Sequence, residues 1–417
     1  MEAAGNTSRV TIASIAAGGD GVGRVDGLAV FVPRTAPGDV VEARVVARGR
    51  FARGRLVRVL EAGTGRTAPR CPHYVHDHCG GCQLQHLDYA AQLDAKRGIV
   101  RDAMQRIARR DTPLPEITPS PSPWAYRAKL TLTMRWTPGE AGWTLGLHAH
   151  DDPARIFQLR ECPITDPAVV AAWQEVQAAA DLLPRERELR GAVRRVGPAM
   201  AFVLEGGTRW DRAREFARRC PSLHVVRWHP VHDPPVVIQD HRASAAPAAA
   251  FEQVNPAVAA LLRDTLLQRA LAVAPRHAVD AYAGHGETAR MLARHAVAVT
   301  AIEVDREAAR HAAVTLPEGS RVLQGRVEDV IDSALPADVV ILNPPRAGVD
   351  ARVAAALSRP PWPRLVLYVS CDPATLARDV GRLTGYQITH LHAFDMFPQT
   401  AHVETLCELT PVNSEAA

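Results

Sequence analysis

The chain lacks the marks of several large protein classes. No run of its 417 residues approaches the roughly 20 consecutive apolar residues that a membrane-spanning helix needs. The opening segment, MEAAGNTSRV, also lacks the charged start and apolar core of a signal peptide. We therefore expect a cytoplasmic protein with no membrane partner, and we expect it to act as a monomer.

Lysine and aromatic residues are scarce as well. Lys96 and Lys129 are the only lysines, so the basic charge is almost entirely arginine, and the formal net charge is only +4. Arginine pairs with phosphate through two hydrogen bonds and stacks on bases, so this balance permits RNA binding without proving it. Aromatic residues make up 5% of the chain, which is too few to identify base-stacking platforms from the sequence.

The seven cysteines are an odd number. In a protein expected to be cytosolic, a disulfide framework is therefore disfavoured, and metal binding or catalysis is the better explanation for clustered cysteines. Cys71, Cys79 and Cys82 lie close together in the chain, and Cys162 follows much later, directly before a proline. Four cysteines can hold an iron–sulfur cluster or a zinc ion, and residue types alone leave both open.

Residues 1–66 are predicted to form a small β-barrel, because short apolar runs alternate there with glycine turns. The expected strands are Val10–Ile15, Leu28–Val32, Val40–Val46 and Gly54–Val59. A group of arginines in the second half is compatible with a solvated face or with an RNA-contacting face. These arginines are Arg44, Arg48, Arg50, Arg53, Arg55 and Arg58.

Residues 67–245 are predicted to form a central domain of mixed α and β structure. The proline-rich segment Pro113–Pro123 is interpreted as a linker. Strands are expected over Tyr126–Trp136 and Ala201–Leu204, and a helix around Pro167–Leu183.

From residue 246 to 417 apolar strands alternate with amphipathic helices, which predicts an α/β fold with a doubly wound, mostly parallel, Rossmann-like sheet. The expected strands are Ala278–Ala281, Val297–Val304, Arg321–Gln324, Asp338–Leu342 and Leu365–Ser370. Ligands of such sheets bind beyond the carboxyl ends of the strands, so the residues at those ends are the candidates for function.

Two of these strand ends indicate adenosine binding. Gly284 and Gly286 follow the first strand and permit a tight turn close to a ligand. Glu303 ends the next strand, where a carboxylate can accept hydrogen bonds from ribose hydroxyls. An NAD-binding fingerprint would require a third glycine at the position of Ala289, so S-adenosylmethionine is favoured over NAD.

Two further strand ends are more specific. Asn343 is followed by two prolines, which cannot continue a strand and so predict a rigid loop over the crevice. Cys371 lies between the fifth strand and a helix start, where the helix dipole would favour a thiolate.

With these motifs the chain resembles the S-adenosylmethionine-dependent RNA 5-methyluridine methyltransferases, and its first 66 residues resemble a TRAM domain. The resemblance rests on four segments: Phe251–Asn255, Asn343–Gly348, Tyr368–Leu376 and Met396–Glu404. It implies that Cys371 is the nucleophile and Glu404 the general base. The implied cofactor contacts are Gln253, Tyr282, Glu287, Glu303, Arg326 and Asn343, of which Glu287, Arg326 and Asn343 depart from the residue types usual in the family. The implied ligands of a 4Fe–4S cluster are Cys71, Cys79, Cys82 and Cys162.

The predicted function is methyl transfer from S-adenosylmethionine to C5 of a uridine in RNA, through a covalent bond between Cys371 and C6. Thiolate addition turns C5 into a nucleophile, and a base must later remove the C5 proton. Resemblance favours 23S ribosomal RNA over transfer RNA as substrate. One alternative is an RNA-binding protein with an inactive methyltransferase domain. Another is a methyltransferase acting on cytosine C5 or on an exocyclic amine. The reaction at an exocyclic amine would not need Cys371.

Overall fold

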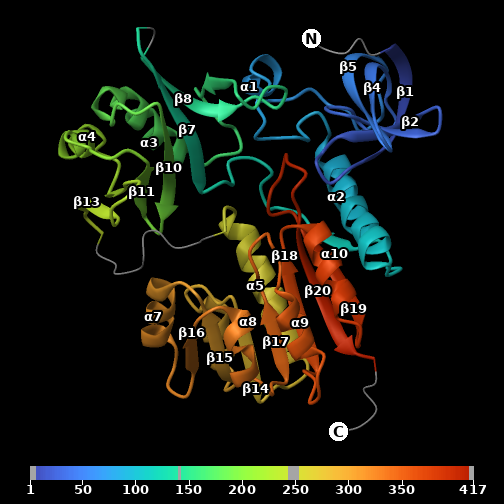
Figure 1. Cartoon of the computed structure of the whole chain (residues 1–417), viewed down its shortest axis with the longest axis vertical. Coiled ribbons are helices and arrows are strands. Elements are labelled where there is room, and N and C mark those ends of the chain that lie inside the picture. The colour runs from blue at the N-terminus through green and yellow to red at the C-terminus, as the bar shows by residue number, and fades with distance from the viewer. Residues whose placement is uncertain (1–5, 140–141, 243–252, 413–417) are drawn as a thin grey trace.

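The computed structural model describes residues 6–139, 142–242 and 253–412. The predicted boundary at residue 246, and Phe251 of the first family-like segment, lie outside these ranges. Figure 1 shows three lobes: a blue N-terminal barrel, a green central sheet, and a yellow-to-red C-terminal sheet below both. In the described part of the chain, no helix is long and apolar enough to cross a bilayer.

The N-terminal lobe is a closed five-stranded barrel with strand order β1-β2-β3-β5-β4, as predicted. Val10, Val30, Val32 and Val41 fill its interior. The prediction missed β2, a short strand rich in glycine between two turns. The strands are β1 (Asn6–Ile15), β2 (Gly21–Val25), β3 (Leu28–Val32), β4 (Val40–Arg48) and β5 (Phe51–Glu61).

The chain then runs from the barrel towards the C-terminal lobe through α1 (Pro72–His76), α2 (Tyr89–Ala103), the π-helical turn η1 (Met104–Ala108) and β6 (Glu116–Thr118). Asp88 caps α2 by accepting a hydrogen bond from the Ala91 N–H at 2.8 Å. The interpretation of Pro113–Pro123 as a linker is wrong in one respect. It contains β6, which pairs in parallel with an edge strand of the C-terminal sheet because neighbouring prolines do not remove its ladder hydrogen bonds.

The central lobe is a seven-stranded sheet of order β13-β12-β11-β10-β7-β8-β9. Helices α3 and α4 lie on one of its faces, where Leu130, Leu132 and Phe202 pack against Trp173 and Phe216. Its strands are β7 (Lys129–Thr137), β8 (Gly142–His148), β9 (Ile156–Gln158), β10 (Glu188–Val196), β11 (Ala199–Glu205), β12 (Val225–His229) and β13 (Val236–Asp240). Its helices are α3 (Pro167–Ala178), the 3₁₀ turn η2 (Ala180–Leu182) and α4 (Ala213–Arg219).

The C-terminal lobe is an eight-stranded sheet of order β16-β15-β14-β17-β18-β20-β19-β6. Strands β14 to β18 are parallel, and β20 runs antiparallel to both β18 and β19. The strands are β14 (His277–Ala281), β15 (Ala298–Glu303), β16 (Arg321–Gln324), β17 (Val339–Leu342), β18 (Leu365–Ser370), β19 (Tyr386–Phe394) and β20 (Glu404–Pro411). The helices are α5 (Pro256–Leu271), α6 (Glu287–Ala293), α7 (Arg306–Thr315), α8 (Val327–Val330), the 3₁₀ turn η3 (Ile331–Ser333), α9 (Ala351–Leu357) and α10 (Pro373–Arg382).

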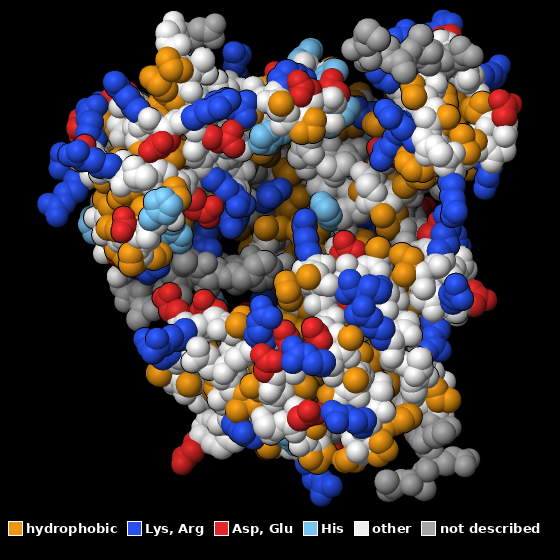
Figure 2. All heavy atoms as spheres, in the orientation of Figure 1, with side chains coloured by type: hydrophobic (Ala, Val, Ile, Leu, Met, Phe, Trp, Pro, Cys, Tyr) orange, Lys and Arg blue, Asp and Glu red, His pale blue; other side chains and the backbone are white. Residues whose placement is uncertain are grey.

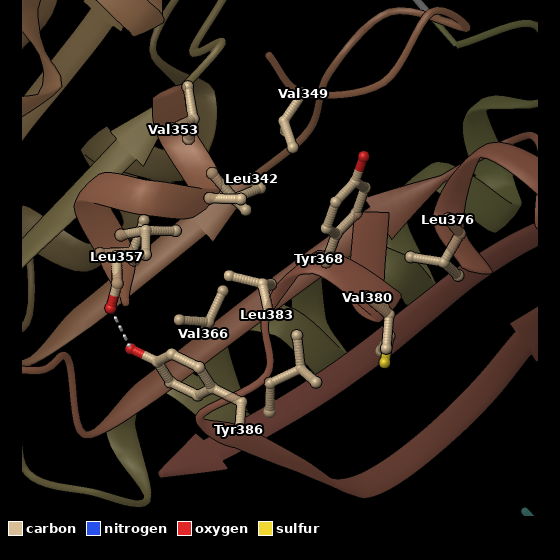
Figure 3. Packing of buried hydrophobic residues seen from close by; sticks show 14 of the residues in the cluster. Leu342, Val349, Val353, Leu357, Val366, Tyr368, Leu376, Val380, Leu383 and Tyr386 are labelled. Atoms are coloured by element: carbon tan, nitrogen blue, oxygen red, sulfur yellow. Dashed lines mark hydrogen bonds between the residues drawn. The ribbon is translucent and has the colours of Figure 1, made fainter. Parts of the chain in front are cut away.

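Alternate strand residues of this sheet enter two cores, as a doubly wound fold requires. Leu365 and Leu367 face α5 and α6, whereas Val366 and Tyr368 face α9 and α10. Figure 3 shows the second core, where the Tyr386 hydroxyl donates to the Leu357 carbonyl oxygen at 3.0 Å. Both faces of β17 and β18 are therefore buried, and their carboxyl ends are held rigidly.

Candidate functional site

The register of β18 and β20 brings the two candidate catalytic residues together. Ser370 is the partner of Thr405 in this antiparallel pair. The next position along the ladder sets Cys371 opposite Glu404, at the carboxyl edge of the parallel strands. Antiparallel pairing thus places two residues that are distant in sequence at one end of the sheet.

The sequence predicted that the helix dipole would favour a thiolate at Cys371, but the pKa of this thiol is raised. Asp372, rather than Cys371, caps α10, by accepting a hydrogen bond from the Thr375 N–H at 2.9 Å. Burial raises the pKa of the Cys371 thiol, and the Glu404 carboxylate raises it further. The Arg346 guanidinium lowers this pKa through its charge and a hydrogen bond to the thiol. In the free protein, therefore, Arg346 is the group that favours the thiolate, and burial outweighs it.

The Glu404 side chain is only 2% exposed. Burial raises the pKa of its carboxyl to about 7, and the charge of Arg346 acts in the opposite direction. Among the described residues, none forms a hydrogen bond with Glu404 Oε2. A buried carboxyl oxygen without a partner, with a pKa near neutrality, has the properties of a general base.

Arg346 received no role from the sequence, although its loop was singled out. The loop is clamped by α10: Thr375 Oγ1 donates to the Arg346 carbonyl oxygen at 3.1 Å, and Arg378 donates to the Ala347 carbonyl oxygen at 2.7 Å. Gly348 has φ +81°, and a Cβ there would lie 2.2 Å from Asp379 Oδ2. The helix that follows Cys371 therefore also fixes the loop that carries its cation. Only the folded structure reveals this link.

Four of the six candidate cofactor contacts line one cavity of about 490 Å³ at the carboxyl ends of β14 and β17. These residues are Gln253, Tyr282, Glu287 and Asn343. Glu287 also forms an ion pair with Arg263 of α5 at 3.3 Å.

Glu303 does not itself line this cavity, but it is hydrogen-bonded to Gly284, which does. Its Oε2 accepts a hydrogen bond from the Gly284 N–H at 2.8 Å, and its Oε1 accepts one from the Asp305 N–H at 2.7 Å. These two amides fix the carboxylate beside the glycine turn and leave each oxygen a further lone pair for a ribose hydroxyl. Asp280, which the sequence did not single out, is buried beneath the turn and accepts from the Ala289 N–H at 3.1 Å.

Arg326 is not among the residues that line the cavity. Its side chain is 71% exposed and pairs with Glu328 at 3.4 Å. Glu328 is only 14% exposed, and its charge raises the pKa of the Tyr282 hydroxyl. Burial is the main cause of the raised pKa of Tyr282, and of the Arg326–Glu328 pair it is Glu328 whose charge adds to it.

The cysteines Cys71, Cys79, Cys82 and Cys162 line a second cavity, of about 280 Å³. Burial raises the pKa of Cys79 to about 11 and also raises the pKa values of Cys71 and Cys82, and the charge of Cys162 adds to each of these increases. Within the described ranges, no three His, Cys, Asp or Glu side chains converge closely enough to hold one metal ion.

The cysteine cavity extends to the loop of Arg346 and to the segment that precedes Glu404. Arg346, Phe397, Thr400 and His402 contribute to its wall. The segment 395–403, which leads into Glu404, is attached to the cysteine loop because the Gln83 and Leu84 N–H groups both donate to the Gln399 carbonyl oxygen. The same segment is tied to α2 by the fully buried ion pair of Lys96 and Asp395.

Comparison with known proteins agrees with this geometry. Residues 318–410 match the model of the tRNA (uracil-5-)-methyltransferase family, and residues 3–57 match the TRAM domain. The chain is 33% identical to an uncharacterised RNA methyltransferase of Gloeobacter violaceus, over 97% of this chain and 96% of that one. A similar relative from Synechocystis is 32% identical over 98% and 96% of the two chains.

Among solved structures, the tRNA (uracil-54, C5)-methyltransferase of Pyrococcus abyssi in complex with S-adenosyl-L-homocysteine has the same overall fold. It superimposes with a TM-score of 0.68 and 22% identity, covering 97% of this chain and all of that one. The predicted fold class, a TRAM-like barrel followed by a central domain and a Rossmann-like methyltransferase domain, is confirmed. The chain belongs to the uracil-5 family of S-adenosylmethionine-dependent RNA methyltransferases.

Proposed function

We propose that this protein methylates C5 of a uridine in RNA, with Cys371 as nucleophile and Glu404 as general base. The observation that carries the proposal is the position of a thiol near a buried carboxyl, beside a cation, with no hydrogen-bond partner for Glu404 Oε2 among the described residues. An exocyclic-amine methyltransferase would need neither group. An inactive RNA-binding relative would have no reason to keep both.

The first step uses Arg346 to favour the Cys371 thiolate, which adds to C6 of the uracil ring. The new S–C6 bond leaves electron density at C5, and S-adenosylmethionine supplies an activated methyl group to that carbon. Asn343, at the rim of the cofactor cavity, can accept the uracil N3–H through its amide oxygen. Glu404 then removes the C5 proton, the C6–S bond breaks, and the thiolate and the uracil double bond are restored.

The cofactor cavity fits S-adenosylmethionine in its chemistry. Glu303 is oriented for the ribose hydroxyls, and the cavity extends to Asn343, next to the loop that carries Arg346. Among the predicted contacts, Gln253, Tyr282 and Glu287 remain part of the proposed site. We replace Arg326 by Glu328, because its carboxylate is the group near Tyr282.

We also propose that the cysteine cavity holds a 4Fe–4S cluster. A zinc ion would draw four sulfurs to about 2.3 Å from one centre, whereas these four thiols share the wall of a cavity of about 280 Å³ with many other residues. The neighbouring His73 is already occupied: its Nδ1 contacts Asp77 at 2.7 Å and its Nε2 accepts from the Arg160 N–H at 3.1 Å. Anaerobically purified protein should contain equal amounts of iron and acid-labile sulfide, and stoichiometric zinc instead would contradict the proposal.

The decisive test of the catalytic proposal is covalent trapping. RNA that contains 5-fluorouridine should form a denaturation-resistant adduct with the protein in the presence of S-adenosylmethionine. Release requires removal of a proton from C5, and a base cannot remove fluorine in its place. Cys371→Ala should abolish the adduct, and Cys220→Ala, which removes a buried thiol of the central lobe, should leave it unchanged. An adduct that survives Cys371→Ala would overturn the assignment. Ribosomal and transfer RNA offered in competition would identify the substrate, for which we favour 23S ribosomal RNA.

A further inference from the structure

The cofactor cavity contains charged side chains that the sequence did not assign to it. Besides Glu287, the described residues that line it include Arg263 of α5 and Arg290 of α6. Glu287 is the one carboxylate among these lining residues. S-adenosylmethionine carries an ammonium and a carboxylate at its methionine end, and a charge that leaves water is costly unless it is paired. The methionine end therefore needs one partner of each sign.

The two arginines of the cavity have different surroundings. Nη1 of Arg290 donates to the His285 carbonyl oxygen at 2.7 Å and to Thr315 Oγ1 at 2.8 Å. These two bonds tie the Arg290 guanidinium to the glycine turn and to the last residue of α7. Arg263 instead contacts a carboxylate, that of Glu287. We therefore consider Arg290 a support of the glycine turn and Arg263 the cation available to a ligand.

Arg263 and Glu287 form a loose ion pair across two helices. Nη1 of Arg263 is 3.3 Å from Oε2 of Glu287, which is longer than the about 2.7–2.9 Å of a charge-assisted hydrogen bond. The two side chains are 27% and 56% exposed. A guanidinium has five N–H donors and a carboxylate has about four acceptor positions. One contact between them therefore leaves both groups able to bind a ligand.

The polarity of this pair is fixed by its chemistry. A guanidinium only donates hydrogen bonds and an ionised carboxylate only accepts them, so Arg263 suits a ligand carboxylate and Glu287 suits a ligand ammonium. Two other carboxylates near the glycine turn are already engaged. Glu303 accepts from the Gly284 and Asp305 amides, and Asp280 is buried and accepts from the Ala289 amide.

The outer surface of the C-terminal lobe has charges of both signs. Figure 2 shows acidic and basic side chains interspersed over the face of this lobe that it presents. A strong surface potential requires charges of one sign to gather. Recognition of a small ligand that carries both signs therefore depends on individual side chains within the cavity.

We propose that Arg263 and Glu287 bind the methionine end of S-adenosylmethionine, Arg263 through its carboxylate and Glu287 through its ammonium. The proposal rests on the proposed cofactor site and assigns the two charged partners at one end of it. It adds Arg263, which the sequence did not single out, to the residues that select this cofactor.

The test compares three ligands that differ only in the charges at this end. S-adenosyl-L-homocysteine has both charges, decarboxylated S-adenosylmethionine keeps the ammonium alone, and 5′-methylthioadenosine has neither. Arg263→Gln should weaken binding of S-adenosyl-L-homocysteine about 10- to 100-fold, because a hydrogen bond between charged groups is lost. It should leave decarboxylated S-adenosylmethionine bound equally well or more tightly. Isothermal titration calorimetry measures each affinity.

Glu287→Gln should give a different pattern. It should weaken both S-adenosyl-L-homocysteine and decarboxylated S-adenosylmethionine, since each carries the ammonium. Neither variant should alter the affinity for 5′-methylthioadenosine. The matched control is Arg269→Gln, which removes another arginine of α5, paired with Glu408 at 3.7 Å. The control should bind all three ligands as the unaltered protein does.

Two results would overturn the proposal. Unchanged affinity of Arg263→Gln for S-adenosyl-L-homocysteine would show that Arg263 does not contact the methionine end. An equal loss of affinity for S-adenosyl-L-homocysteine and 5′-methylthioadenosine would show that the ion pair only maintains the shape of the cavity.

Failure of this proposal can be distinguished from failure of the proposed function. At saturating S-adenosylmethionine, Arg263→Gln should still form the Cys371 adduct with RNA that contains 5-fluorouridine, because the reacting groups are intact. An unaltered protein that binds S-adenosyl-L-homocysteine but forms no adduct would refute the proposed function. An adduct in the unaltered protein, with full affinity for S-adenosyl-L-homocysteine in both variants, would refute only the roles of Arg263 and Glu287.

Discussion

The protein holds cysteine side chains in two settings. One setting contains Cys371, and the other contains Cys71, Cys79, Cys82 and Cys162. Cys371 stands at the end of a buried strand with one cation and one carboxylate beside it. The other four contribute to the wall of one cavity, and burial and the charge of Cys162 both raise the pKa values of Cys71, Cys79 and Cys82. In the first setting a single thiol is held beside a cation and a carboxylate, which suits nucleophilic attack. In the second, four thiols line one cavity, which suits ligation. Neighbours, rather than residue type, separate reactivity from ligation.

Exchanging one sulfur for oxygen at each site is the strongest way to break this comparison. Cys371→Ser should lower methyl transfer on the order of 10⁴-fold or more, because a catalytic nucleophile has no substitute, and should leave the melting temperature unchanged. Cys79→Ser should lower the melting temperature and cost much less activity. Methyl-transfer assays and thermal melts of both variants would check this. Equal losses of activity would show that the two sites are not separate in function.

Removal of the base should affect the end of the reaction rather than its beginning. Glu404→Gln should slow release of methylated RNA by about 10²–10⁴-fold and trap the methylated adduct. In the unaltered protein, the release rate should rise with pH and level off above about 7, where the carboxyl is ionised. Rapid-quench measurement of the adduct across pH would check both. If release by Glu404→Gln keeps the same pH profile, a group other than Glu404 is the base.

Glu404 also predicts a pH dependence of stability. Its pKa is raised from 4.5 to about 7 in the folded protein, so the folded state binds the proton more tightly than the unfolded state. The stabilisation is complete below the unfolded value and is lost as pH rises through about 7. Glu404→Gln stays neutral, so its melting temperature relative to the unaltered protein should rise between pH 5 and pH 8. Parallel melting curves of the two proteins over this range would contradict the assigned pKa.

The connection between the two thiol sites can be broken at Lys96. Its buried ammonium pairs with Asp395 and donates to the Phe397 carbonyl oxygen at 2.9 Å. Lys96→Met leaves a buried carboxylate without its cation and should cost about 3–5 kcal/mol of unfolding free energy. Adding Asp395→Leu should restore part of that loss. Denaturant titrations of the single and double variants measure the coupling, and additive losses would exclude it.

The smallest expected effect concerns the loop that carries Arg346. Gly348→Ala places a methyl group against Asp379 at a positive φ, which should cost about 1–3 kcal/mol. Displacement of Arg346 should slow adduct formation at Cys371 without altering iron content. Gly319→Ala is the control, since Gly319 also has positive φ but open space around it. Equal effects of the two variants on adduct formation would show that Arg346 is not positioned through Gly348.

The accuracy of the sequence predictions followed the strength of the local signal. The parallel strands were predicted nearly to the residue, because most of them are buried on both faces and read as short apolar runs between breakers. β2, β6, β19 and β20 were not among the strands named from the sequence. β2 is rich in glycine and β6 has three residues among prolines, so both carry little signal of their own. Of the proposed cofactor contacts, Arg326 lies outside the cavity, because its position at the start of α8 does not reveal where the side chain points.

By itself, the amino-acid sequence was sufficient to identify the family, the doubly wound sheet and the residues at the carboxyl ends of its strands, because alternating burial and strand-end motifs are local properties. Two features required the tertiary structure: Glu404 near Cys371, and Arg346 as the cation beside both. Each depends on strand register or on packing between segments far apart in the chain, and neither is encoded at any single position.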